Sequence, residues 1–269
     1  MTASIPQTPI VNASTLYCNG LQLSKTAAKQ VTMQLGAARD STNTNDIILG
    51  ATSATPDEAT TPAVPLVING AVVGANGVDV AVLADSLFYA VYIIGDSTGY
   101  QPTAGLLSLN ATTPNLPGGY PFGGYDMYRR VGWVLTDGSA NILQFWQYGS
   151  DETRMYYYDV GIGVTAVNET SFTALSLAAA VPPIATEVLL NTTFGANAAG
   201  DLLQFLPYGS SASSGIVQIG TGVITGTAAQ VSMVTVPCEL HTGAPTILYK
   251  MAASDTLTLL VAGYKDYIV

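Results

Sequence analysis

Hydrophobic and polar positions alternate over short runs of this chain, as in half-buried β-strands. Between Val64 and Val73, the dipeptide Asn69-Gly70 is a tight-turn signal and predicts a hairpin. An apolar run covers Leu87–Ile94, and aromatic runs follow at Tyr128–Thr136 and Ile142–Tyr148. The best helix candidate, Thr26–Arg39, is interrupted by Gly36 and fits strand equally well. The first half of the chain is therefore predicted to be β-structure.

The second half repeats short β-type runs with turn residues between them. These runs are Phe172–Leu177, Thr186–Phe194, Leu202–Leu206, Gly215–Ile219, Gln230–Val236, Thr246–Met251 and Thr256–Val261. Their spacing is typical of an antiparallel β-sandwich or jelly roll. We predict an all-β protein with an extended N-terminal arm (residues 1–16), a β-domain with the Tyr/Trp-rich strands (17–155) and a jelly-roll-like β-sandwich (156–269).

One nine-residue segment has an echo 60 positions later: Ile142–Ser150 and Leu202–Ser210 are identical at six of nine positions. The echo has two interpretations. It reflects either two related β-domains in tandem or two hairpins that converged on one turn. It occurs once, so it does not indicate a repeat array.

Charged residues make up 10% of the chain, against about 25% in an average soluble domain. A surface with so few charges is consistent with burial against other chains, although Ser, Thr and Asn also solvate a surface. The net charge is −10 and the eight cationic residues are scattered, so we expect neither nucleic acid nor an anionic membrane as a partner.

The two cysteines, Cys18 and Cys238, are far apart and have no metal-site spacing. We expect two buried thiols in a protein made in a reducing cytoplasm. The first residues, Met1–Pro6, have neither a basic nor an apolar region, so we expect no secretory signal. No uninterrupted apolar run approaches the roughly 18–20 residues of a membrane-spanning helix.

The strongest catalytic motif is Gly95–Gly99, a literal G-x-S-x-G around Ser97. A nucleophile elbow needs a helix directly after the serine. Residues Tyr100–Thr103 do not begin a convincing helix, and the single histidine, His241, lies where a strand runs into a turn. We interpret the motif as a turn that ends a buried strand.

Other candidate sites are weaker. Gly161–Ala166 matches a dinucleotide fingerprint, but its β-branched residues oppose the required helix. Asp151 and Glu152 are adjacent, so on a strand they point to opposite faces and do not form a glycosidase pair. Solvated turns are favoured over divalent-cation binding at two further aspartate pairs, Asp40 with Asp46 and Asp79 with Asp85. We expect no enzyme activity, no metal and no cofactor.

Several tyrosines near glycine-rich or strand segments could stack on sugar rings, or could pack in the core or an interface. The candidates for glycan contact are Tyr120, Tyr125 and Tyr157.

Three stretches between residues 39 and 148 resemble tailed-bacteriophage virion proteins of the decoration, head-fibre and tail-fibre type. They are Arg39–Ile47, Phe88–Ser97 with Gly105–Ser108, and Tyr128–Ser139. The later residues resemble phage β-sandwiches only in general. The resemblance implies a homotrimer without enzyme activity that assembles in the bacterial cytoplasm.

From the resemblance we expect a virion protein on the outer capsid surface. It would be a decoration (cement) or head-fibre protein that binds itself and the major capsid protein or other virion proteins. The alternative is a tail fibre that recognises a host-surface glycan. The expected interface residues combine the arm with cationic and aromatic strand residues: Ile5, Pro6, Pro9, Ile10, Arg129, Arg130, Trp133 and Trp146.

Overall fold

The structure, a computed structural model, describes residues 17–50, 64–118, 124–149, 153–211, 215–220 and 229–268. Within these ranges the chain forms β-strands and no α-helix, which confirms the all-β prediction. Most strand pairs there are antiparallel, whereas β7 (Gly77–Val78) runs parallel to β9 (Ala104–Ser108). No helix in the described residues is long and apolar enough to cross a membrane. The expected N-terminal arm lies outside these ranges, and jelly-roll connectivity stays a prediction.

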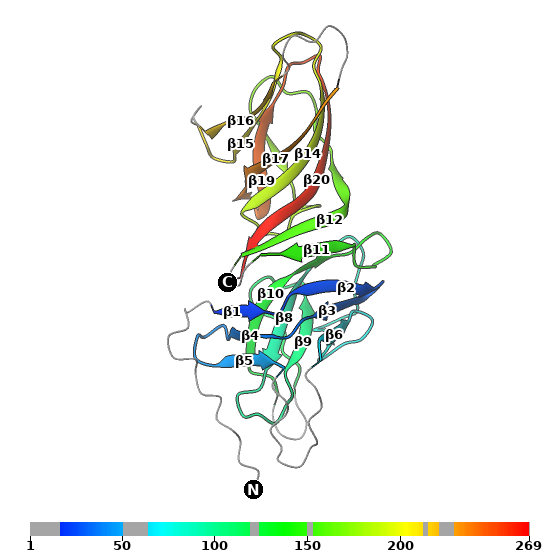
Figure 1. The fold of residues 1–269 in the computed structure, drawn as a ribbon, viewed down its shortest axis with the longest axis vertical. Helices are drawn as coiled ribbons and strands as arrows, with labels where there is room; N and C mark the ends of the chain where they lie inside the picture. The colour runs from blue at the N-terminus through cyan, green and yellow to red at the C-terminus, as the bar shows by residue number, and fades with distance from the viewer. Residues whose placement is uncertain are drawn as a thin grey trace. The chain divides into compact units, whose positions relative to one another are not determined.

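The chain divides into two compact units. Unit 1 comprises Met1–Arg154 with Ile268–Val269, and unit 2 comprises Met155–Tyr267. In Figure 1 the strands of unit 1 run from blue to green, and those of unit 2 from green to red.

Unit 1 contains three groups of hydrogen-bonded strands. The first has the order β1 (Cys18–Gly20), β4 (Gly36–Arg39), β5 (Asp46–Leu49). The second has the order β10 (Met127–Leu135), β8 (Phe88–Gly95), β9, β7. The third has the order β11 (Phe145–Tyr148), β2 (Leu23–Ala27), β3 (Gln30–Met33), β6 (Leu66–Asn69).

The core of unit 1 is built on β8 and β10. Seven of the eight residues of β8 are buried, so this strand reads as a continuous apolar run without alternation. Trp133 of β10 is 1% exposed and meets Phe88 edge-on, with 6.4 Å between the ring centroids. The aromatic strands thus pack unit 1 from within.

Unit 2 contains two groups of strands. One has the order β17 (Ala229–Pro237), β14 (Glu187–Gly195), β20 (Thr256–Tyr267), β12 (Thr153–Val164). The other has the order β13 (Thr173–Ser176), β19 (Ala244–Lys250), β15 (Leu202–Pro207), β16 (Val217–Gly220), and β18 (Glu239–His241) also pairs with β19. All seven strand runs predicted in the second half are therefore confirmed. Most boundaries differ from the prediction by one or two residues, and β20 continues six residues beyond Val261.

Two local features differ from the simplest sequence patterns. The segment Thr26–Arg39 is not helical and contributes to β2, β3 and β4. The predicted hairpin at Asn69-Gly70 is wrong, because β6 pairs instead with β3. The side chain of Asn69 accepts the main-chain N–H of Ala71 at 3.0 Å, and this local turn directs the chain away from a second strand.

The two echo segments take different partners. Strand β11 pairs with β2, whereas β15 pairs with β16 and β19. In both segments a glycine with positive φ follows the strand, Gly149 at 116° and Gly209 at 80°. The shared sequence therefore specifies a strand followed by such a glycine, while the partners of the strand depend on other parts of the chain.

Candidate functional site

The three stretches that carry the phage resemblance meet at one end of unit 1. The turn between β4 and β5 reaches β10, where the N–H of Ser41 donates to the carbonyl oxygen of Tyr128 at 2.8 Å. Strands β8 and β10 run antiparallel with Met127 opposite Gly95, so the turn after β8 lies beside the start of β10. We call these turns, residues 40–45, 96–103 and 124–126, the loop end.

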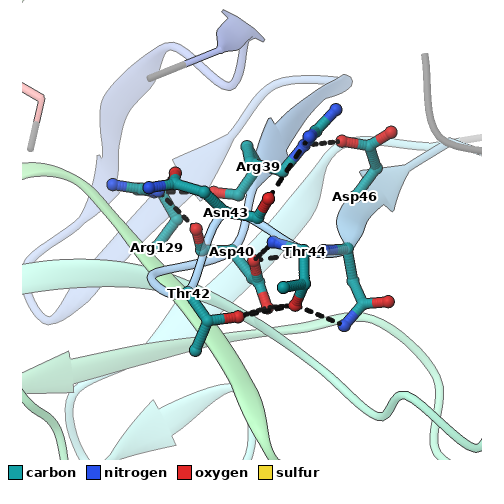
Figure 2. Close-up of polar contacts among 8 residues, drawn as sticks. Arg39, Asp40, Thr42, Asn43, Thr44, Asp46 and Arg129 are labelled. Carbon is teal, nitrogen blue, oxygen red and sulfur yellow. Dashed lines mark hydrogen bonds and ion pairs between the residues drawn. The ribbon is translucent and has the colours of Figure 1, made fainter. Parts of the chain in front are cut away.

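The first turn of the loop end is organised by Asp40, whose side chain is almost fully buried (Figure 2). Its Oδ1 accepts the main-chain N–H groups of Thr44 at 2.8 Å and Asn45 at 3.2 Å. Its Oδ2 accepts the Thr42 hydroxyl at 2.7 Å. Burial alone raises the pKa of Asp40, but the hydrogen bonds from Thr42, Asn45 and Thr44 outweigh it and hold the pKa below its ordinary value.

Arg129 of β10 fastens this turn to the sheet (Figure 2). Its Nε donates to the carbonyl oxygen of Arg39 at 2.6 Å, and its Nη2 donates to Asn43 Oδ1 at 3.0 Å and to the carbonyl oxygen of Asp40. Burial lowers the pKa of Arg129, and the nearby carboxylate of Asp40 opposes that effect. A guanidinium group stays protonated up to pH values far above neutral, so Arg129 remains a charged donor here. Beside it, Arg39 and Asp46 close the hairpin with an ion pair at 2.7 Å.

The second turn of the loop end follows the same principle with Asp96. One carboxylate oxygen accepts the N–H of Thr98 at 2.9 Å, and the other accepts the N–H groups of Tyr100 at 3.0 Å and Gln101 at 2.9 Å. Burial opposes ionisation of Asp96, but these bonds and the Thr98 hydroxyl lower its pKa. The carboxylate thus fixes the turn by satisfying donors of the main chain.

Aspartates elsewhere serve the same purpose. In the described part of the chain, seven aspartate carboxylates accept main-chain N–H groups: Asp40, Asp79, Asp96, Asp126, Asp137, Asp201 and Asp255. The described residues contain no group of three or more His, Cys, Asp or Glu arranged to hold a metal ion. Of the aspartate pairs considered from the sequence, Asp79 accepts the Ser108 hydroxyl at 2.6 Å and Asp85 is exposed. These carboxylates therefore bind main-chain donors of nearby turns or of loops that are distant in sequence.

The G-x-S-x-G motif forms a turn with no helix after it, because the chain enters strand β9 at Ala104. The hydroxyl of Ser97 donates to the carboxylate of Asp126, whose other oxygen accepts the Ser97 N–H at 2.8 Å. His241 belongs to unit 2, where its Nε2 lies 3.3 Å from the hydroxyl oxygen of Tyr208. The local geometry of a nucleophile elbow is therefore not formed at Ser97.

The remaining motifs are placed as follows. Gly161 and Gly163 lie within strand β12, which continues to Val164, so the fingerprint segment does not open a helix there. Asp151 and Glu152 lie outside the described residues. The absence of enzyme activity stays a prediction.

The expected interface residues divide into three groups. The arm residues Ile5, Pro6, Pro9 and Ile10 lie outside the described ranges. Arg129, Arg130 and Trp133 are 4%, 3% and 1% exposed, and the Arg130 guanidinium carbon lies 5.3 Å from the centre of the Trp133 ring. These three side chains therefore act inside unit 1, which differs from the subunit-facing role expected of them. Trp146, on β11, is 43% exposed.

The glycan candidates are also dispersed. Tyr120 lies outside the described residues. Tyr125 is half-buried and donates its hydroxyl to the carbonyl oxygen of Pro102 at 3.0 Å, and burial raises its pKa. Tyr157 is half-buried on β12. The structure thus uses Tyr125 to bind the turn that follows Asp96.

Sequence reasoning missed a surface of unit 2. The strand register places one set of side chains from β17, β14 and β20 on the same side, opposite the buried Leu190 and Phe194. We call this the outer face: Val231, Met233, Thr235, Asn191, Thr193, Thr258 and Leu260. None of these residues is charged, and Val231 and Met233 are 68% and 62% exposed. The alternation in β17 was visible in the sequence, but not which side faces the core.

The fold and these surfaces define an all-β, mainly antiparallel protein of two units. No family model matches the chain, and no curated protein matches it. Among solved structures it is similar to the carboxy-terminal domain of the turkey type 3 siadenovirus fibre, avirulent form, complexed with 3-sialyllactose. That match has 10% sequence identity, covers 49% of this chain and 92% of the other, and has a TM-score of 0.18. Such a score carries no argument about function.

Proposed function

We propose that this protein is a non-enzymatic structural component of a bacteriophage virion, which acts by covering and binding neighbouring protein subunits. Capsid decoration, or the base of a head fibre, is the form of this role that we favour. The proposal combines the resemblance of three stretches to phage virion proteins with the surfaces of the two units.

The observation that carries the proposal is the outer face of unit 2. Its exposed Val231 and Met233 stand among Thr and Asn side chains without a charge. An ion pair, Lys265 Nζ to Glu187 Oε1 at 2.9 Å, lies at one end of the same strands. Exposed apolar groups on an uncharged pleated surface are typical of protein interfaces, where charged residues are depleted.

The loop end of unit 1 gives independent support for a structural role. Its aspartates are engaged with main-chain donors, and its arginine is engaged with main-chain carbonyl oxygens. Such turns present a fixed shape because their polar groups are already satisfied. The first two resembling stretches contribute turns to this end and the third begins beside it at Tyr128, which is consistent with a shared architectural role for them.

Stabilisation of a shell would follow from mass action. A protein that binds the assembled lattice and not the free subunits stabilises the lattice by an amount that grows with its concentration. A homotrimer, which the phage resemblance implies, would present its outer faces in several copies and gain from multivalency.

The test is co-sedimentation of the purified protein with empty capsids of the phage that encodes it, together with gold labelling on intact virions. We expect binding and a head location. Thr193→Glu with Thr258→Glu adds two charges to the outer face and should weaken binding at least about tenfold, since like or unpaired charges are costly at an interface.

Val160→Glu is the control for an added charge away from the outer face, because Val160 is 77% exposed on β12. Gly161, its neighbour, faces Leu260 of the outer face, so Val160 points to the opposite side. Label on the tail and no affinity for capsids would reject the capsid role and favour the tail-fibre alternative. Hydrolysis of an ester or glycan that is lost in Ser97→Ala would reject the non-enzymatic role.

A further inference from the structure

Strand β17 stands at one end of its sheet with a long, regular edge. Each of its nine residues is paired with β14, from Ala229 opposite Gly195 to Pro237 opposite Glu187, with no bulge. Within the described residues, β14 is the strand hydrogen-bonded to it, and no described strand pairs with its other edge. From Ala229 to Thr235 exposed residues alternate with half-buried ones, so both faces retain access to solvent there, whereas Val236 is buried.

This edge lacks the features that normally protect edge strands, namely short length, bulges and charged side chains. The other described strands that are hydrogen-bonded to one strand only have such features. Seven of them are four residues long or shorter: β1, β5, β6, β7, β13, β16 and β18. The eighth, β10, carries Arg129 and Arg130 and has a bulge before Gly132. Strand β17 contains no charged residue and its proline stands at the last position.

A second copy of this chain fits this edge by symmetry, because antiparallel pairing of a strand with its own copy is self-complementary. Each copy carries a net charge of −10, which opposes self-association, and an uncharged strand is where two copies meet with least repulsion. An antiparallel register centred on Met233 aligns all nine residues of both strands, Ala229 opposite Pro237, and no two like charges face each other.

We propose that β17 of one copy pairs antiparallel with β17 of a second copy about a two-fold axis at Met233, which extends the sheet of unit 2 across both chains. In this register Val231 lies opposite Thr235 of the second copy on the outer face, and the two Met233 side chains meet. The inference rests on the proposed structural role and names one partner for it. A two-fold contact produces dimers, or pairs of trimers if the trimer also forms.

The test is oxidative cross-linking of Met233→Cys in the full chain, read on a non-reducing gel. Directly opposite residues of antiparallel strands have Cα atoms about 4.5–5.5 Å apart, within the range of a disulfide. We expect rapid cross-linking into dimers that reducing agent reverses. Val160→Cys, which is 77% exposed in the same unit, is the control for random collision and should remain uncross-linked. Native Cys18 and Cys238 are buried.

A second measurement introduces charged residues of either sign on β17 and follows self-association by the mass in solution. Val231→Lys/Met233→Lys and Val231→Glu/Met233→Glu should each self-associate at least about fivefold more weakly than the wild type, because like charges then face each other across the axis. Mixing equal amounts of the two variants should restore the dimer, or the pair of trimers, because lysine then faces glutamate across the axis. Both positions are exposed, so the variants should keep the wild-type circular dichroism spectrum.

Equal cross-linking of Met233→Cys and Val160→Cys would overturn the inference, as would a wild-type protein that is monomeric or purely trimeric. Capsid binding is measured separately, so it can survive the loss of this contact. Conversely, if Met233→Cys forms the dimer but the protein has no affinity for capsids, the β17 contact stands and the capsid role is rejected.

Discussion

The guanidinium of Arg129 donates a hydrogen bond to the main-chain carbonyl oxygen of Asp40, a residue 89 positions earlier in the chain. The same side chain binds the carbonyl oxygen of Arg39 at 2.6 Å. Two strands and one turn are thereby joined through a single buried cation. Main-chain carbonyl oxygens that are buried need donors, and here one side chain supplies several of them.

Arg129→Met should lower the free energy of unfolding by about 3 kcal/mol, because the apolar side chain fills similar space but leaves buried carbonyl oxygens without their donor. Arg129→Lys should cost about half as much, since one ammonium cannot reproduce the planar fork. Urea denaturation followed by tryptophan fluorescence measures this, because both tryptophans, Trp133 and Trp146, belong to unit 1. Lys29→Ala is the control and should change little, and an equal loss there would contradict the assigned role.

Acid should weaken the turns of the loop end. The pKa values of Asp40 and Asp96 are lower in the folded protein than in the unfolded chain, so the folded state binds fewer protons. Their contribution is present above the unfolded value of about 3.9 and is lost as the pH falls through the lower folded values. At pH 7, Asp40→Asn should cost about 2 kcal/mol.

The difference between wild type and Asp40→Asn should shrink below about pH 4, where the wild-type carboxylate also becomes protonated. Thermal unfolding at a series of pH values tests this. Asp85→Asn is the control, because Asp85 is exposed. A difference that stays constant from pH 7 down to pH 2.5 would show that the charge of Asp40 contributes nothing to the turn.

The thiols should be inert in the folded protein. Burial raises the pKa of Cys238 to about 12, and its Sγ donates to the carbonyl oxygen of Ala185 at 3.3 Å. Cys18 is fully buried, and neither cysteine forms a disulfide. Because the thiolate is the reactive form, an aromatic disulfide reagent at pH 8 should label neither cysteine in native protein and both in 8 M urea, about 2 thiols per chain. Rapid labelling of native protein that disappears in Cys238→Ala would contradict the burial of Cys238.

Gly263 of β20 is required by a close approach of two strands. A Cβ at this position would fall on the carbonyl oxygen of Tyr156, which belongs to the main chain and cannot move aside. Gly263→Ala should therefore destabilise unit 2 by about 3 kcal/mol, measured by thermal unfolding followed by circular dichroism. At Gly215 a Cβ meets nothing within 4 Å, so Gly215→Ala should leave the transition within about 0.5 kcal/mol of the wild type. Similar shifts in both variants would contradict the close approach.

Part of the loop end could be predicted from sequence, and part could not. Asp, Asn and Thr in residues 40–46 predict a turn because their short side chains bind the nearby main chain. The partner of that turn, Arg129, could not be found, because nothing local distinguishes an arginine that faces solvent from one that binds a distant carbonyl.

The all-β class and the positions of most strands in unit 2 can be inferred from the amino-acid pattern, because alternation and turn residues act over a few positions. That Arg129, Arg130 and Trp133 are interior, and that Val231 and Met233 are exposed, becomes known from the folded chain. Side chains of a strand alternate between two faces, and which face is buried depends on strands that are distant in sequence.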